Sequence, residues 1–272
     1  MVHIQIRQAV KAFVLLLFAV FIFILHETGE ITRFINPNYL YFSQIASVIF
    51  LFLFFIQVPR IFTHLQIEND HSECGLWGCN HDAGEGGLTL KTIFAYGLII
   101  MPLLTGFLLP YKDFGAAEAL KRGISYSTHD HGHLEEHDIL DGQLERRVKE
   151  MLKQSVIHFN NENFASYIGA ITTYPNSFVG KSIVLEGFIL EDDSLTSNHS
   201  IITRFLVTHC VADAHATGIV IENGASFGIQ ENSWIRVKGE LNVQKGDSIL
   251  FPIINVSSWE EIQSPIDPYV YP

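Results

Sequence analysis

The feature that most constrains this chain is the concentration of long apolar stretches in its first 110 residues. Residues 12–25 form an unbroken apolar run, preceded by Arg7 and Lys11. With these flanks the run is long enough to cross a hydrocarbon core of about 30 Å, and the stem of Lys11 can reach back to the interface. The segment HETGEITRF that follows offers no small-residue cleavage site, so we predict an uncleaved anchor and not a secretory signal.

A second apolar stretch covers residues 39–58. Tyr39 and Tyr41 fall where amphipathic rings prefer the membrane interface, and Arg60 follows just beyond the stretch. These flanks indicate a second transmembrane helix.

A third apolar stretch covers residues 92–109, with Pro102 near its centre. Pro102 should kink a helix, and such kinks are tolerated in membranes where neighbouring helices satisfy the freed backbone groups. We therefore predict a transmembrane domain of three helices over residues 1–110, with the third helix packed against a partner.

The distribution of Lys and Arg predicts the orientation of these spans. Arg7 and Lys11 precede the first span, while Arg60 and Lys91 flank the loop 63–90. Since short cytoplasmic segments carry an excess of these residues, we expect the N-terminus and this loop in the cytoplasm. Three spans then place the C-terminal part outside the cell, in a multi-pass protein of a bacterial cell membrane.

The second half of the chain has the patterns of a soluble α+β domain over residues 141–272. Apolar residues recur at helical spacing over 141–160, and a second helical stretch over 164–174 ends at a proline. This helical lead-in, 141–174, precedes a change to a period of two.

Five short segments with that period, bounded by turn residues, favour a small antiparallel, OB-like β-barrel over residues 178–263, followed by a tail, 264–272. The predicted strands are 182–190, 203–211, 218–222, 234–241 and 249–256.

The charge balance excludes one class of partner. The chain has 17 Lys and Arg against 29 Asp and Glu, a formal net charge of -12. A nucleic-acid-binding protein needs a basic face to neutralise phosphates, so we expect the lipid bilayer and no nucleic acid among the partners.

Four potential metal ligands lie close together in the loop 63–90: His71, Cys74, Cys79 and His81. Thiolate and imidazole groups suit a four-coordinate zinc ion, and their spacing is compatible with a single tetrahedral site. An exposed polar loop with two reduced thiols is the alternative, and an inverted topology would favour a disulfide between the two cysteines.

A second group, His129, His131, His133 and His137, belongs to a His-rich linker over residues 111–140. Alternation places the first three on one side of an extended chain, where neutral imidazoles can bind zinc or copper. The alternative is a solvated linker without a metal. The phrase HDHGH lacks the aspartate of the H-x-H-x-D-H signature of zinc hydrolases, which argues against that chemistry.

A third possible group consists of His209, Cys210, Asp213 and His215. On a strand, His209 and Cys210 would point to opposite faces, so only Cys210 with Asp213 or His215 could share an ion across the turn. The alternative is that Cys210 is a small buried hydrophobic residue.

Aromatic residues near the tail allow two further interpretations. Phe178, Val179, Tyr269 and Tyr271 could form a docking surface, or the tail could pack on its own barrel. The sequence shows no nucleophile with an evident base, no phosphate-binding glycine loop and no paired catalytic carboxylates, so we expect no enzymatic activity.

Several phrases together resemble the YcgQ family of bacterial permease subunits over nearly the whole chain. They are LHETGEITRFINPNYLYFSQIASVIF, TGFLLPYKDF, YPNSFVGKSIVLEGFI, THCVADAHATGIVIE, WIRVKGEL and PYVYP. The resemblance implies a small membrane protein made beside a larger multi-helix permease of the YcgR type, with a barrel-like C-terminal domain. It also implies a link to zinc, because members often carry a His-rich stretch between their second and third spans.

The leading functional hypothesis is therefore an accessory subunit of a membrane permease that handles or transports zinc. The alternative is a membrane-tethered metal sensor or assembly factor, which binds a protein partner through its barrel domain.

Overall fold

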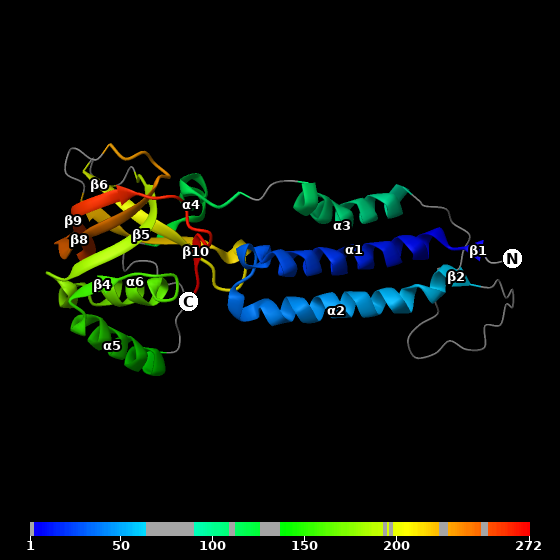
Figure 1. Cartoon of the computed structure of the whole chain (residues 1–272), viewed down its shortest axis with the longest axis horizontal. Coiled ribbons are helices and arrows are strands. Elements are labelled where there is room, and N and C mark those ends of the chain that lie inside the picture. The colour runs from blue at the N-terminus through cyan, green and yellow to red at the C-terminus, as the bar shows by residue number, and fades with distance from the viewer. Residues whose placement is uncertain are drawn as a thin grey trace. The chain divides into compact units, whose positions relative to one another are not determined.

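The computed structural model divides the chain into two compact units (Figure 1). The first consists of Met1–Thr32 and Pro37–Lys112, and the second of Arg33–Asn36 and Asp113–Pro272. The structure describes residues 3–63, 90–108, 112–125, 137–192, 195, 198–222, 228–245 and 250–272.

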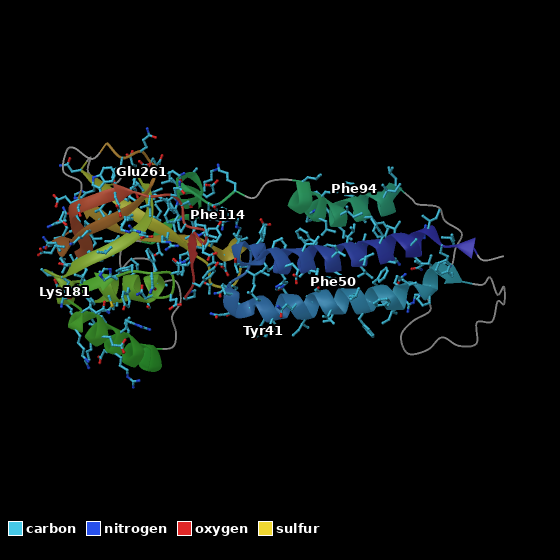
Figure 2. All side chains as sticks on the ribbon, in the orientation of Figure 1. Tyr41, Phe50, Phe94, Phe114, Lys181 and Glu261 are labelled. Atoms are coloured by element: carbon cyan, nitrogen blue, oxygen red, sulfur yellow. The ribbon has the colours of Figure 1, made fainter. Side chains whose placement is uncertain are left out.

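The first unit is built from three apolar helices, α1 (Ile6–Thr28), α2 (Leu40–Gln57) and α3 (Leu90–Leu108). Helices α1 and α2 form an antiparallel hairpin, because strand β1 (His3–Ile4) before α1 pairs with strand β2 (Phe62–Thr63) after α2. Apolar side chains cover the outside of the helices (Figure 2), where Tyr41 is 53% and Phe94 75% exposed. Such a surface suits contact with lipid or with other helices.

Polar side chains of the hairpin bond across the two helices. Nε2 of His26 lies 2.8 Å from Oγ of Ser43, and the Ser47 hydroxyl donates to a carbonyl of α1 at 3.1 Å. Nε2 of Gln57 donates to Oε1 of Gln8 at 2.5 Å. Because hydrocarbon offers no alternative partner, such bonds hold membrane helices together, each by about 0.6 kcal/mol.

Helix α3 packs on α1 and contains Pro102, as predicted. A Cβ atom at Gly106 would lie 2.7 Å from Cζ of Phe21, and Leu103 is 2% exposed. Among the described residues, the segments long and apolar enough to cross a membrane are Ile6–Thr28 and Pro37–Ile61. Two of the predicted spans thus meet this criterion, and the third stays a prediction.

The centre of the second unit is a closed five-stranded barrel, as predicted. Its strands pair in the order β5, β8, β9, β7, β6 and back to β5. Strands β7 and β9 run parallel, so the prediction of an all-antiparallel barrel is wrong in this pair. The reason is the odd number of strands: the other four pairs of the closed ring are antiparallel, so β7 and β9 point in the same direction. This is the Greek-key order of an OB-like barrel. The strands are β5 (Ser182–Leu190), β6 (His199–Leu206), β7 (His215–Glu222), β8 (Trp234–Lys245) and β9 (Leu250–Glu261).

The helical prediction for residues 141–160 is wrong at its end. Helix α5 (His137–Lys153) stops earlier, and strand β4 (Val156–His158) follows and pairs parallel with β5. The β-branched Val156 and Ile157 favour a strand, and Ile157 is fully buried there. Helix α6 (Phe164–Thr173) lies within one residue of its prediction.

The core lies between the barrel and these two helices. Alternate residues of β8, among them Ile235, Val237 and Leu241, point inward and are at most 1% exposed. Phe164 and Ile171 of α6 belong to the same buried cluster. The inward face of each strand is thus covered by apolar side chains, the main source of folding free energy.

Short elements complete the unit. Strand β10 pairs parallel with β6, and strand β3 pairs parallel with β7. The remaining elements are α4 (Ala116–Arg122), β3 (Ile124–Ser125), β10 (Tyr269–Val270) and the 3-10 turns η1 (Glu30–Arg33), η2 (Pro37–Tyr39), η3 (Pro59–Ile61), η5 (Pro175–Phe178) and η6 (Val211–Asp213).

Alanine substitutions at two glycines of this unit should have opposite effects on the free energy of unfolding. A Cβ atom at Gly187 in β5 would lie 2.6 Å from the carbonyl oxygen of Thr203, whereas one at Gly169 in α6 meets nothing within 4 Å. We expect Gly187→Ala to lower the free energy of unfolding by about 1 to 3 kcal/mol through overpacking. Gly169→Ala should raise it by about 0.5 to 1 kcal/mol.

Urea unfolding of the detergent-solubilised full chain, followed by tryptophan fluorescence, measures both effects. A Gly187→Ala protein with an unchanged midpoint would contradict the close β5–β6 packing.

Candidate functional site

The turn after β6 gathers backbone N–H groups around one carboxylate. Asp213 accepts hydrogen bonds from the backbone of Thr208 at 3.1 Å and of His209 at 2.9 Å. Nδ1 of His209 lies 3.1 Å from the same carboxylate. Partial burial acts to raise the pKa of Asp213, but the hydrogen bonds from His209, Cys210 and Thr208 outweigh it and lower that pKa. Asp213 therefore serves as the cap of this turn.

The third predicted metal group lies in and after this turn. Strand β6 ends at Leu206, so the prediction that His209 and Cys210 occupy a strand is wrong. The Cys210 backbone N–H reaches Asp213 at 3.4 Å, and His215 begins β7. Within the described part of the chain, no group of three or more His, Cys, Asp or Glu side chains is placed to hold a metal ion. Metal binding by this group stays a prediction.

The other predicted ligands lie almost entirely outside the described residues. His137 is the first residue of α5, and only its backbone is described. The remaining seven are His71, Cys74, Cys79, His81, His129, His131 and His133.

The segment Arg33–Asn36 pairs with this turn as part of the second unit. Ile35 forms an antiparallel bridge with Cys210. Two backbone hydrogen bonds flank the bridge: the N–H of Asn36 donates to a carbonyl of the turn at 3.0 Å, and a carbonyl of the segment accepts from the turn at 2.8 Å. The connection between α1 and α2 is therefore joined to the barrel by backbone pairing.

The Asn36 side chain strengthens this pairing. Its Nδ2 donates to the carbonyls of Thr208 at 2.8 Å and Val207 at 3.3 Å, and the residue is 2% exposed. A buried amide without partners costs about 1 to 3 kcal/mol, so these two bonds select asparagine at this position.

Among the described residues of the barrel unit, Arg204 of β6 is the buried charged side chain, 3% exposed. Its Nε donates to the carbonyl of Pro268 at 3.2 Å, and its Nη2 to that of Asp267 at 2.9 Å. Its Nη1 donates to Oδ1 of Asn161 at 2.7 Å. Burial lowers the pKa of Arg204 to about 10, partly offset by Glu186 and Asp267, so the guanidinium stays charged at neutral pH.

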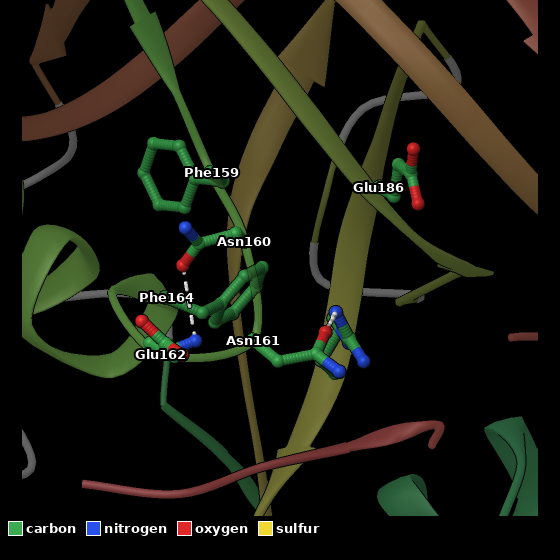
Figure 3. Close-up of a pocket in the computed structure, with 7 residues that line it drawn as sticks. Phe159, Asn160, Asn161, Glu162, Phe164 and Glu186 are labelled. Carbon is green, nitrogen blue, oxygen red and sulfur yellow. Dashed lines mark hydrogen bonds between the residues drawn. The ribbon is translucent and has the colours of Figure 1, made fainter. Parts of the chain in front are cut away.

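A surface pocket of about 450 Å³ lies beside Arg204 (Figure 3). Phe159 and Phe164 supply its aromatic walls, and Glu186 binds Arg236 at 2.7 Å. Oδ1 of Asn160 accepts two backbone N–H groups of its own turn, and Asn161 binds Arg204. The hydrogen bonds of Asn160 thus stabilise this loop, and Asn161 holds the Arg204 side chain that binds the tail. Its lining residues are Phe159, Asn160, Asn161, Glu162, Phe164, Glu186 and Arg204.

The C-terminal tail packs on its own barrel. Tyr269 is 2% exposed, its hydroxyl accepts the N–H of Phe114 at 3.3 Å, and Val207 donates to the carbonyl of Val270 at 2.9 Å. Burial raises the pKa of Tyr271 to about 12. Packing is thus the correct alternative for Tyr269, and Tyr271 is half-buried.

The other two candidates for the docking surface, Phe178 and Val179, differ in their burial. Phe178 is fully buried, whereas Val179 is 52% exposed. The predicted docking surface therefore loses two of its four residues, Phe178 and Tyr269, to the interior of the barrel unit.

Sequence reasoning missed the roles of Arg204 and Asn36. Arg204 interrupts the apolar run IITRFLV, and a charge within such a run is a usable sign of a buried anchor. Asn36 gives no comparable sign, because asparagine beside Pro37 is typical of any turn.

Comparison with known proteins covers both units. The DUF1980 N-terminal domain model matches residues 10–125, and the DUF1980 C-terminal domain model matches residues 135–272. The chain belongs to the DUF1980 family. No solved structure matches this DUF1980 chain.

Two relatives align with this DUF1980 chain over almost its whole length. The UPF0703 protein YcgQ of Bacillus subtilis (strain 168) is 26% identical over 282 residues, covering 96% of this chain and 98% of the relative. A protein of Streptococcus mutans serotype c (strain ATCC 700610 / UA159) is 20% identical over 269 residues, covering 91% and 93%. That protein is named "Putative two-component membrane permease complex subunit". The resemblance to the YcgQ family is confirmed.

Arg204→Lys should release the tail. A lysine cannot reproduce the three divergent hydrogen bonds, so we expect a loss of about 3 kcal/mol in unfolding free energy and faster carboxypeptidase digestion of residues 264–272. Arg236→Lys is the matched control, because Arg236 is exposed and binds Glu186 and Glu260 at the surface. Its cost should stay below about 1 kcal/mol. If carboxypeptidase digested the tail equally fast in both variants, this would contradict the role of Arg204 in anchoring the tail.

Asp213 should make the turn sensitive to acid. Its pKa is lower in the folded chain than the unfolded value of about 3.9, so its carboxylate stabilises the fold above that pH. The stabilisation is lost as the pH falls through the folded pKa. Asp213→Asn should therefore flatten the fall of the urea midpoint below about pH 4, whereas Glu261→Gln at an exposed position serves as the control. If the urea midpoint of Asp213→Asn fell with decreasing pH as steeply as that of the unmodified chain, this would argue against Asp213 as the cap of the turn.

Proposed function

We propose that this DUF1980 chain is a non-enzymatic accessory subunit of a two-component membrane permease. The observation that carries the proposal is the alignment with the Streptococcus mutans relative, which covers 91% of this chain and whose name describes a permease complex subunit. The alignment includes both the apolar helices and the barrel unit, so the likeness extends beyond a shared membrane anchor.

The helices of the first unit support a partner within the bilayer. Phe52 and Phe55 of α2 are 63% and 61% exposed, and Phe94 of α3 is 75% exposed. Large aromatic side chains are enriched at the centres of protein interfaces. In this proposal, a multi-helix permease of the YcgR type packs against part of this apolar surface, and lipid covers the remainder.

Zinc is the ion that we assign to this subunit. The support is chemical: His71, Cys74, Cys79 and His81 provide borderline-soft donors in one short loop, and the histidines from 129 to 137 provide a second set. Conduction requires binding that is favourable enough for entry and weak enough for release. Glycine-rich loops meet this requirement, because ordering them offsets part of the coordination energy.

The charge bias supports an orientation for this handling. Arg7, Lys11, Arg60 and Lys91 favour a cytoplasmic N-terminus and a cytoplasmic 63–90 loop. The barrel unit and the second donor set would then lie outside the cell, which gives zinc donors on both faces of the membrane.

The barrel favours a second candidate function. Five-stranded barrels of this order are common binding modules, and the chain could be a membrane-tethered metal sensor or assembly factor. Cellular zinc content separates the two: deleting the gene changes it under the transport hypothesis and leaves it unchanged under the sensor hypothesis.

The proposal predicts co-purification and bound zinc. The affinity-tagged chain, co-expressed with the YcgR-type permease, should retain the permease in mild detergent. Zinc measured by mass spectrometry should fall by at least half when His71, Cys74, Cys79 and His81 are replaced by alanine. Replacing His158 and His199 is the matched control and should leave the zinc content unchanged.

Two results would contradict this prediction separately. If the zinc content of the four-residue variant is unchanged, the loop 63–90 does not bind the measured zinc. A tagged chain that purifies without the permease removes the subunit assignment.

A further inference from the structure

We infer that the connection between α1 and α2 is an integral part of the barrel unit, and that this pairing requires α3 to cross the membrane. The inference concerns the topology of the chain and does not rest on the proposed function. It uses hydrogen bonds within each unit and the covalent order of the elements, and it is independent of the charge bias.

The first step is the pairing of Arg33–Asn36 with the barrel unit. The Ile35–Cys210 bridge and its two flanking backbone hydrogen bonds add a short antiparallel edge to the turn after β6. Asn36 is 2% exposed and binds two further carbonyls. Non-helical backbone that pairs in this way forms on one side of a bilayer, since the hydrocarbon core admits no such irregular edge.

The second step follows from the α1–α2 hairpin. Helix α1 ends at Thr28 and α2 begins at Leu40, so Arg33–Asn36 lies on the membrane face where both helices meet. At their other ends β1 pairs with β2. With 23 and 18 residues, the helices are about 34 and 27 Å long, which matches a core of about 30 Å. Strand β2 therefore lies on the face opposite to Arg33–Asn36.

The third step is the return of the chain. The chain must pass from Thr63, on one face, to Asp113, the start of the rest of the barrel unit, on the other. Helix α3, with 19 residues and a length of about 28 Å, is the described helix available for this crossing. Helix α3 runs in the same direction as α1 (Figure 1), and Gly106 of α3 contacts Phe21 of α1. A parallel third helix arrives at the face where α1 ends.

This topology separates the two predicted donor sets. The loop 63–90 shares a face with the N-terminus, whereas the linker that carries His129 to His137 shares a face with the barrel unit. The separation holds whichever face is cytoplasmic.

Thiol labelling tests the topology directly. Three single-cysteine chains are needed: Glu30→Cys in the α1–α2 connection, Lys238→Cys on β8, and native Cys74 in the loop 63–90, each with the other cysteines replaced by alanine. Glu30 and Lys238 are exposed positions. An impermeant maleimide is applied to intact cells and to inverted membrane vesicles.

The expected result is that positions 30 and 238 react from the same face and Cys74 from the opposite one, with at least a tenfold preference in each case. Opposite labelling of positions 30 and 238 would overturn the pairing of the connection with the barrel unit. Labelling of Cys74 and position 238 from one face would overturn the crossing of α3.

A disulfide provides the second test. Residues opposed in an antiparallel pair have Cα atoms about 4.5 to 5.5 Å apart, within the range of a disulfide. In a Cys74→Ala, Cys79→Ala chain, Ile35→Cys should therefore bond to native Cys210 under mild oxidation. A protease site inserted between residues 126 and 136 then cuts the chain into two fragments.

The two fragments should migrate as one band without reductant and as two bands with it. The same chain with Cys210→Ala is the control and should always give two bands. Separation of the fragments of the cysteine pair without reductant would overturn the bridge.

Discussion

The parallel pairing of β7 with β9 is the interaction on which the second unit depends. It joins Val220 to Ile253 and closes the sheet, so that each of the five barrel strands has a hydrogen-bonded neighbour on both sides. Closure removes the exposed edges that favour aggregation and gives the inward side chains a common core. The β6–β7 pair extends along this barrel as a full eight-residue ladder, and its far end offers edges to which β10 and β3 pair.

The backbone groups of the first unit also require hydrogen-bond partners, but the solvent around them is hydrocarbon and not water. Its helices satisfy their backbone groups internally, so hydrocarbon can surround them. Side-chain hydrogen bonds such as His26 to Ser43 and Gln57 to Gln8 then fix which helix faces meet. Apolar contacts alone would fix this less well, because lipid tails compete equally for apolar surface.

Much of the fold follows from sequence periodicity, and the departures have physical causes. Strand β5 runs over 182–190 as predicted, because both its ends carry turn residues and the residues between them are mostly β-branched or apolar. The helix predicted to residue 160 fails because helical spacing and a short strand are indistinguishable over Val156 to His158, where pairing with β5 decides the outcome. The parallel β7–β9 pair depends on a contact between residues far apart in the chain, which local patterns do not encode.

For the candidate site too, the sequence predicts some features, whereas others follow only from the three-dimensional structure. The predicted groups at 71–81 and 129–133 lie outside the described residues, and residue chemistry remains their support. The sequence offers Asp213 as a possible metal ligand across the turn, whereas its role as a cap follows from three-dimensional geometry. Asn36 could not be found from its sequence neighbourhood, because its partners lie 171 and 172 residues away.

The end of β6 is where these separate features meet. Within four residues, Arg204 holds the tail through two carbonyls, and Val207 both donates to Val270 and accepts from Asn36. The tail and the α1–α2 connection thus depend on the same short backbone segment. Residues that share partners are coupled energetically, so loosening the tail should weaken the attachment of the connection as well. The end of β6 therefore holds two segments far apart in the sequence, residues 33–36 and the C-terminal tail, within the barrel unit.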